Sequence, residues 1–80
     1  MTEAPGPDRE LDDDEILKYI HDEYSPAVGT ADVAEEFGVT QQSAYNYLTR
    51  LQSEGYVESR KVGRANAWWL TDKGKKRIAP

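Results

Sequence analysis

The sequence of 80 residues contains no cysteine. This absence excludes disulfide bonds, thiolate metal sites and thiol-based redox sensing, and it fits a cytoplasmic location. Histidine occurs only as His21, and a single histidine without cysteine partners does not build a structural zinc site. No apolar stretch reaches the length of a membrane-spanning helix or a signal-peptide core, so we expect no membrane partner.

Patterns that serve catalysis are also missing. The sequence has no nucleophile elbow, no phosphate-binding glycine loop and no convergent acid–base set. The acidic run is no metal site, because consecutive helical residues point in different directions and the calcium-loop spacing is absent. This run consists of Asp12, Asp13, Asp14 and Glu15. We therefore predict no enzymatic activity and no cofactor.

Charge is divided unevenly along the chain. Residues 1–36 hold twelve acidic against two basic side chains, whereas residues 37–80 hold three acidic against eight basic ones. The net charge of −5 therefore hides a basic second half, which suits a polyanionic partner. Residues 1–10 contain two prolines and a glycine without periodicity and are predicted to be a disordered tail. Residues 11–80 form one predicted domain.

Residues 30–55 read as two helices joined by a tight turn. An apolar stripe marks the first helix and consists of Val33, Ala34 and Phe37. Thr30 is its predicted N-cap, and Gly38 ends it. The second helix is predicted from about Gln41 to Glu54, with Thr40 as its N-cap. Its buried side consists of Ala44, Leu48 and Leu51.

The outward side of this second helix has an unusual composition. It carries Gln41, Gln42, Ser43, Tyr45, Asn46, Thr49 and Arg50. Apart from the arginine, these residues are neutral and hydrogen-bonding, whereas an ordinary solvated helix face is rich in Glu and Lys. Amides can bind adenine edges, and hydroxyl groups can reach bases or phosphates. The face is therefore predicted to enter a DNA major groove.

The flanking segments complete an α+β domain. A first helix is predicted from Leu11–Asp13 onwards, with a buried stripe made of Ile16, Leu17, Ile20 and Tyr24. Alternating residues then predict strands at 56–62 and 67–70, a turn at 63–66 and a short helix from 71 or 72 to 78. Because Leu70 must face the core, period two places Trp68 inside and Trp69 outside.

Several of these segments resemble one family. They are the stretch TADVAEEFGVT at 30–40, then Ser43, Ala44, Leu48 and Leu51, then GYV at 55–57 and LTDKG at 70–74. Together they resemble the helix–turn–helix of winged-helix transcriptional regulators, most of all small archaeal and MarR-like ones. The resemblance covers roughly residues 12–76. It implies a winged helix–turn–helix fold, with a three-helix core, a β-hairpin wing, a short strand at 27–29 that pairs with the wing, and a short C-terminal helix.

The resemblance also implies a partner and a role for each polar group. Double-stranded DNA is the expected partner, read at its bases by Gln41, Gln42, Ser43, Tyr45 and Asn46. Backbone contacts are expected from Thr30, Thr40, Thr49 and Arg50, and wing contacts from Arg60, Lys61 and Arg64. A homodimer is implied as well. The chain departs from the full-length MarR pattern by lacking the terminal helices that build the dimer interface and effector pocket, so no small-molecule effector is expected.

Other functions compete with this interpretation. The leading alternative is a winged-helix adaptor for protein–protein contact in transcription or replication, which would use the acidic first helix and an outward Trp69. A domain that binds RNA or single strands is a second alternative, and an enzyme is the third.

Overall fold

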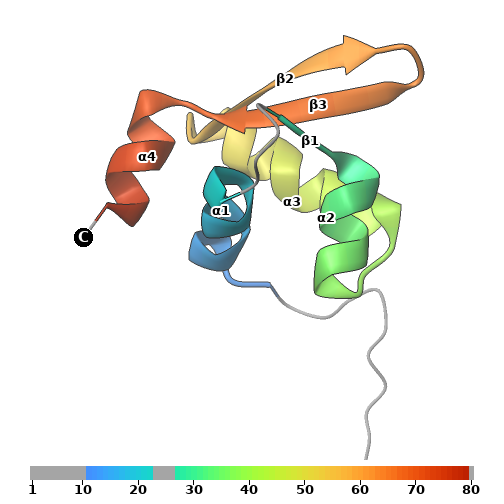
Figure 1. Ribbon diagram of the computed structural model, residues 1–80, viewed down its shortest axis with the longest axis horizontal. Helices are drawn as coiled ribbons and strands as arrows, with labels where there is room; N and C mark the ends of the chain where they lie inside the picture. The colour runs from blue at the N-terminus through green and yellow to red at the C-terminus, as the bar shows by residue number, and fades with distance from the viewer. Residues whose placement is uncertain (1–10, 23–26, 80) are drawn as a thin grey trace, which may run out of the picture.

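The computed structural model describes residues 11–22 and 27–79. In this part of the chain, four helices lie on one side and at one end of a three-stranded antiparallel sheet (Figure 1). The elements in chain order are α1 (Asp13–Asp22), β1 (Val28–Gly29), α2 (Thr30–Phe37), α3 (Gln41–Ser53), β2 (Val57–Val62), β3 (Ala65–Leu70) and α4 (Asp72–Ile78). The predicted α+β winged helix is therefore confirmed. The predicted tail at 1–10 and the predicted core position of Tyr24 lie outside the described residues.

The sheet has the strand order β1-β3-β2, and its longest part is the β2–β3 hairpin. The predicted strand at 27–29 exists in shortened form, because Val28 pairs with Trp68 on β3. The predicted four-residue turn at 63–66 is wrong. Val62 already pairs with Ala65, so only Gly63 and Arg64 form the turn. Gly63 has φ +63°, which a glycine adopts without strain, and this allows the tighter turn.

The core lies between the helices and one face of the sheet. Its fully buried side chains include Ile16, Leu17, Val33, Leu48, Leu51, Val57 and Trp68. Trp68 is 1% exposed and Leu70 is 7% exposed, whereas Trp69 is half-buried on the other face, so the predicted alternation is confirmed. The predicted stripe of α1 is confirmed at Ile16, Leu17 and Ile20.

The two helices of the helix–turn–helix are capped differently. Thr40 caps α3 as predicted, because its hydroxyl oxygen accepts a hydrogen bond from the Ser43 N–H at 3.1 Å. The predicted cap of α2 is wrong: Gly29 is the N-cap, and its N–H donates to Asp32 Oδ2 at 3.0 Å. Thr30 is instead the first helical residue. Gly38 ends α2 in the left-handed conformation, with φ +69°, as predicted.

The segment LTDKG docks α4 against the connection between α3 and β2. Thr71 caps α4 and also donates its hydroxyl hydrogen to the Gly55 carbonyl oxygen at 2.6 Å. Gly74 is buried against the Tyr56 backbone so closely that a Cβ there would clash with the Tyr56 carbonyl oxygen. Lys73 and Arg77 each lie 4.8 Å from the centroid of the Tyr56 ring. The position of α4 is therefore determined by close backbone contact, by one aromatic ring and by packing against α1.

Candidate nucleic-acid interface

The exposed face of α3 is neutral and polar, as predicted. Gln41, Gln42, Tyr45 and Asn46 are exposed, and Ser43 is half-buried. The opposite face is held in the core by Ala44, Leu48 and Leu51, all at 0% exposure. Because this buried stripe fixes the rotation of the helix about its axis, the amide side chains stay on the outside.

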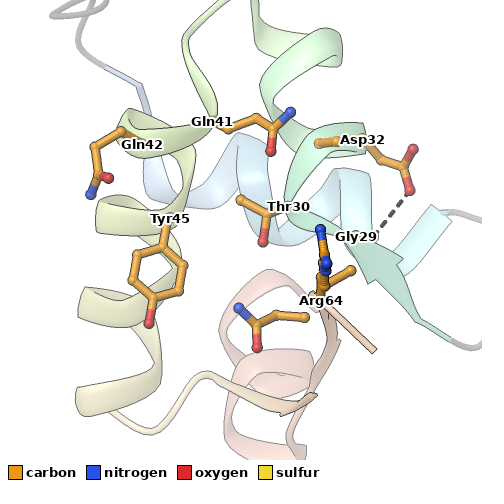
Figure 2. A pocket seen from close by; sticks show the side chains of 10 residues that line it. Gly29, Thr30, Asp32, Gln41, Gln42, Tyr45 and Arg64 are labelled. Carbon is orange, nitrogen blue, oxygen red and sulfur yellow. Dashed lines mark hydrogen bonds between the residues drawn. The ribbon is translucent and has the colours of Figure 1, made fainter. Parts of the chain in front are cut away.

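This face borders an open groove of about 480 Å³ between α3, α2 and the tip of the hairpin. Figure 2 shows Gln41 and Tyr45 of α3 beside the same space as Thr30 of α2 and Arg64 of the turn. The lining residues are Gly29, Thr30, Ala31, Asp32, Gln41, Gln42, Tyr45, Arg64, Ala65 and Asn66. The fold thus brings the predicted base-reading helix and the predicted wing arginine to one side of the molecule.

Two residues connect the groove to a second hollow under the hairpin. Tyr45 and Asn66 line both, and the second hollow also contains Thr49, Gln52 and Ser59. The Tyr45 ring packs edge-on against Trp68, with centroids 6.1 Å apart. Contact with Trp68 therefore fixes one side of the Tyr45 ring, although 41% of the residue's surface is exposed.

Asn66 is the polar groove residue that sequence reasoning missed. The longer predicted turn placed it in a loop, but it lies on β3 opposite Lys61. Residues directly opposite in an antiparallel pair share a face, and positions 66 and 68 of one strand share a face as well. Asn66 therefore faces α3 together with Trp68. The inside–outside alternation of the predicted strand 67–70, continued back by two residues, would have placed Asn66 on the same face as Trp68.

The three predicted wing cations do not all lie on one face of the hairpin. Lys61 pairs with Asn66 and so lies on the face towards α3, whereas Arg60 pairs with Ala67 on the opposite face. Arg64 occupies the turn and lines the groove. Of the predicted cluster, the structure places Arg64 and Lys61 on the α3 side, and Arg60 on the other side of the hairpin.

Arg50 is engaged within the protein. Its guanidinium donates to both carboxylate oxygens of Asp13, Nη2 to Oδ1 at 2.6 Å and Nη1 to Oδ2 at 3.1 Å. Nη1 also lies 3.5 Å from Glu54 Oε2. The hydrogen bond to Asp13 is the main cause that raises the pKa of Arg50 above its ordinary value. Arg50 thus fastens α3 to α1, and its contact with the DNA backbone stays a prediction.

The threonines predicted to contact the DNA backbone all make intramolecular hydrogen bonds. Thr30 Oγ1 accepts from the Trp68 indole Nε1 at 2.9 Å, and Thr40 Oγ1 accepts from the Ser43 N–H. Thr49 Oγ1 donates to the Asn46 carbonyl oxygen at 3.0 Å. Thr30 and Thr40 keep a hydroxyl hydrogen to donate, so an acceptor such as a phosphate oxygen suits them.

The basic helix α4 lies at the opposite end of the hairpin from the turn (Figure 1). One of its cations, Arg77, donates from Nε to Asp14 Oδ1 at 2.8 Å and so connects α4 to α1. The exposed residues Lys73, Lys75 and Lys76 belong to the same short helix. These charges contribute to the general field of the molecule and do not line the groove.

Two further observations concern residues 11–22 and 27–79. None of the helices there is long and apolar enough to cross a bilayer. Nor do three or more histidine, aspartate or glutamate side chains come together there in a way that could hold a metal ion.

A helix–turn–helix followed by a β-hairpin and a terminal helix defines a winged-helix domain. Within that class, a family model described as FaeA-like protein matches residues 12–72. The match covers most of the chain, and the chain belongs to the FaeA-like family. No curated protein matches the sequence.

Solved structures share the fold at low identity. The PcaV transcriptional regulator from Streptomyces coelicolor, in complex with its natural ligand, is 22% identical with a TM-score of 0.72, over 80% of this chain and 46% of that one. Streptococcus pneumoniae FabT in complex with DNA is 24% identical with a TM-score of 0.75, over 89% and 50%. The S. aureus MepR–DNA complex is 19% identical with a TM-score of 0.76, over 82% and 56%.

These neighbours are MarR-family winged-helix transcription regulators, so the predicted resemblance to that group is confirmed for the fold. The chain spans about half the length of each of them. The archaeal part of the resemblance stays a prediction.

Proposed function

We propose that this protein binds double-stranded DNA in a sequence-specific way and thereby regulates transcription. In this proposal α3 enters the major groove, while the hairpin lies on the adjacent backbone and minor groove. The observation that carries the proposal is the groove in which Gln41 and Tyr45 of α3 face Arg64 of the turn. Neutral base-reading groups and a cation thus meet on one open side.

Different residues take different roles in this complex. Gln41, Gln42, Tyr45 and Asn46 contact base edges, because they are exposed on α3. Arg64 enters the minor groove or binds its phosphates, where an arginine is electrostatically favoured. Backbone contacts come from Thr30, Thr40 and Lys61. Ser43, Thr49 and Arg50 contribute less, because they are half-buried or held in intramolecular bonds.

Two features of the DNA-binding neighbours extend the proposal. FabT and MepR have been crystallised with DNA, and the same use of the shared fold is proposed here. Since many MarR-like regulators act as dimers, we also propose that two copies of this chain bind a palindromic site, which would be reflected in a symmetric sequence preference. The expected location is the cytoplasm.

The adaptor function is the second candidate, and one observation favours it. Val62 is 58% exposed on the hairpin face away from α3, and Trp69 lies half-buried on that same face. The acidic first helix supports it less well, because Asp13 and Asp14 are paired with Arg50 and Arg77. DNA binding is the better supported function.

A salt titration of duplex binding tests the proposal. Fluorescence anisotropy with a labelled duplex measures the association constant at salt concentrations from about 50 to about 200 mM. The logarithm of this constant should fall steeply and linearly with the logarithm of the salt concentration. About six phosphate contacts predict a slope near −5. A weak, flat response would favour the adaptor, and equal or tighter binding to the single strand would favour single-strand recognition. Selection from a random duplex pool then reports the preferred site and its symmetry.

A further inference from the structure

Two amide side chains on α3 are joined to each other. Gln42 Nε2 donates a hydrogen bond to Asn46 Oδ1 at 3.0 Å. The two residues are four positions apart, hence neighbours on one helix face, and both are exposed. Among the described residues, this is the one hydrogen bond that either side-chain amide makes. The pair is thus held together and faces outwards.

The bond restricts what the pair presents to a ligand. The groups that it leaves wholly unused are the Gln42 Oε1, an acceptor, and the Asn46 Nδ2, a donor, while Nε2 keeps one hydrogen and Oδ1 one lone pair. Reversing one amide alone would bring two oxygens or two NH₂ groups together, which is unfavourable. The amides can therefore reverse only together, and in the orientation of this hydrogen bond the pair presents the Gln42 oxygen as acceptor beside the Asn46 NH₂ group as donor.

We propose that Gln42 and Asn46 read two adjacent DNA bases as one coupled unit, an inference that rests on the proposed DNA-binding function. Gln42 Oε1 accepts from the amino group of adenine or cytosine at one position. Asn46 Nδ2 donates to guanine O6 or N7, or to thymine O4, at the next position. The separation of stacked bases, about 3.4 Å, suits two groups joined by a single hydrogen bond. The base preferences at the two positions are therefore correlated.

A double-mutant cycle on the selected duplex tests the coupling. Gln42→Ala and Asn46→Ala should each weaken binding about tenfold, the order expected for one good base contact. Each should relax the preference at both positions, because the remaining amide becomes free to reverse. The double variant should lose little more than either single one, not the hundredfold product of two independent contacts.

Two further variants sharpen the test. Gln41→Ala is the matched control, because Gln41 is an exposed α3 amide that makes no hydrogen bond to Asn46. Its effect should multiply with that of Asn46→Ala. Asn46→Asp keeps the acceptor for Gln42 but replaces the outward donor by a second acceptor. It should retain the preference at the Gln42 position and shift the other position to adenine or cytosine. Unchanged thermal melts show that the variants remain folded.

The outcomes separate this inference from the function on which it rests. If the wild type selects a duplex site and the two alanine penalties multiply, the coupling is wrong and the DNA-binding function stands. If Asn46→Asp leaves both base preferences unchanged, the assigned donor role is wrong. If the wild type selects no duplex at all, both the coupling and the proposed function are overturned.

Discussion

The indole Nε1 of Trp68 donates a hydrogen bond to Thr30 Oγ1 at 2.9 Å, which joins the hairpin to the first turn of α2. Trp68 is only 1% exposed, so without this acceptor its N–H would be buried and unpaired. Thr30→Val keeps the shape of the side chain but removes the acceptor. It should lower the free energy of unfolding by about 1–3 kcal/mol in urea denaturation. Thr30→Ser, which keeps the hydroxyl, should restore most of the loss; equal losses in both variants would contradict the role of this bond.

Gly74 is predicted to tolerate no side chain. A Cβ at this position meets the Tyr56 carbonyl oxygen, so Gly74→Ala must displace α4 or the backbone between α3 and β2. We expect a loss of about 1–3 kcal/mol from overpacking, in spite of the better helix propensity of alanine. Thermal unfolding measures it. Lys75→Ala in the same helix is exposed and should change stability by less than about 0.5 kcal/mol.

Leu48 fixes the rotation of α3, because its side chain is fully buried on the face opposite the amides. Leu48→Ala should cost about 2–5 kcal/mol of stability by opening a cavity. Val62→Ala removes two methyl groups from a side chain that is 58% exposed and serves as the control, with little expected change. An unchanged melting temperature for Leu48→Ala would show that α3 is rotated differently.

Arg64 and Arg60 form a matched pair for testing the hairpin. Arg64 lines the groove, whereas Arg60 lies on the face away from α3. Arg64→Ala should weaken specific and non-specific duplexes alike and reduce the salt slope by about 1. Arg60→Ala removes the same charge and should change the slope by less. If the two variants behave alike, the hairpin meets DNA through its general charge and not through the groove side.

The Asp13–Arg50 pair is predicted to contribute modestly to stability. Asp13 is 18% and Arg50 is 44% exposed at the side chain, so solvent screens much of the attraction. Asp13→Asn should cost about 1 kcal/mol or less at low salt, and the difference should shrink at 1 M salt. Glu15→Gln removes an equal charge from the same helix without breaking an ion pair among the described residues. Urea denaturation at both salt concentrations compares the two.

Periodicity was enough to predict the helix–turn–helix and its orientation. The apolar positions of α3 recur at helical spacing, and a helix can bury that stripe in only one rotation, so Gln41 and Asn46 had to face outwards. In the same way, the two-residue alternation on β3 determined that Trp68 is inside. Helix and strand periodicity predicts the buried face correctly because it depends only on residues that are close in sequence.

Features that depend on distant partners were predicted less well. The Asp13 that engages Arg50 lies 37 residues away in sequence, and no local pattern shows that the two meet. The same applies to Thr30, whose hydroxyl accepts the Trp68 hydrogen bond while Gly29 takes the cap position. Strand alternation alone places Arg60 and Lys61 on opposite faces of the hairpin. Because the two cations were treated as one cluster, this placement was not predicted.

The two-residue turn of Gly63 and Arg64 determines how this hairpin can change in length. Because successive side chains alternate between faces, inserting a single residue into β2 would exchange Arg60 and Lys61 between the two sides of the ribbon. Insertion of two residues on each strand beside the turn would carry Arg64 further out by about 6.6 Å, at about 3.3 Å per residue, keep it on the same side of the hairpin and leave the pairing below it unchanged. Variation among related chains is therefore expected to come in matched additions, which lengthen the reach of the arginine without disturbing the tryptophan beneath it.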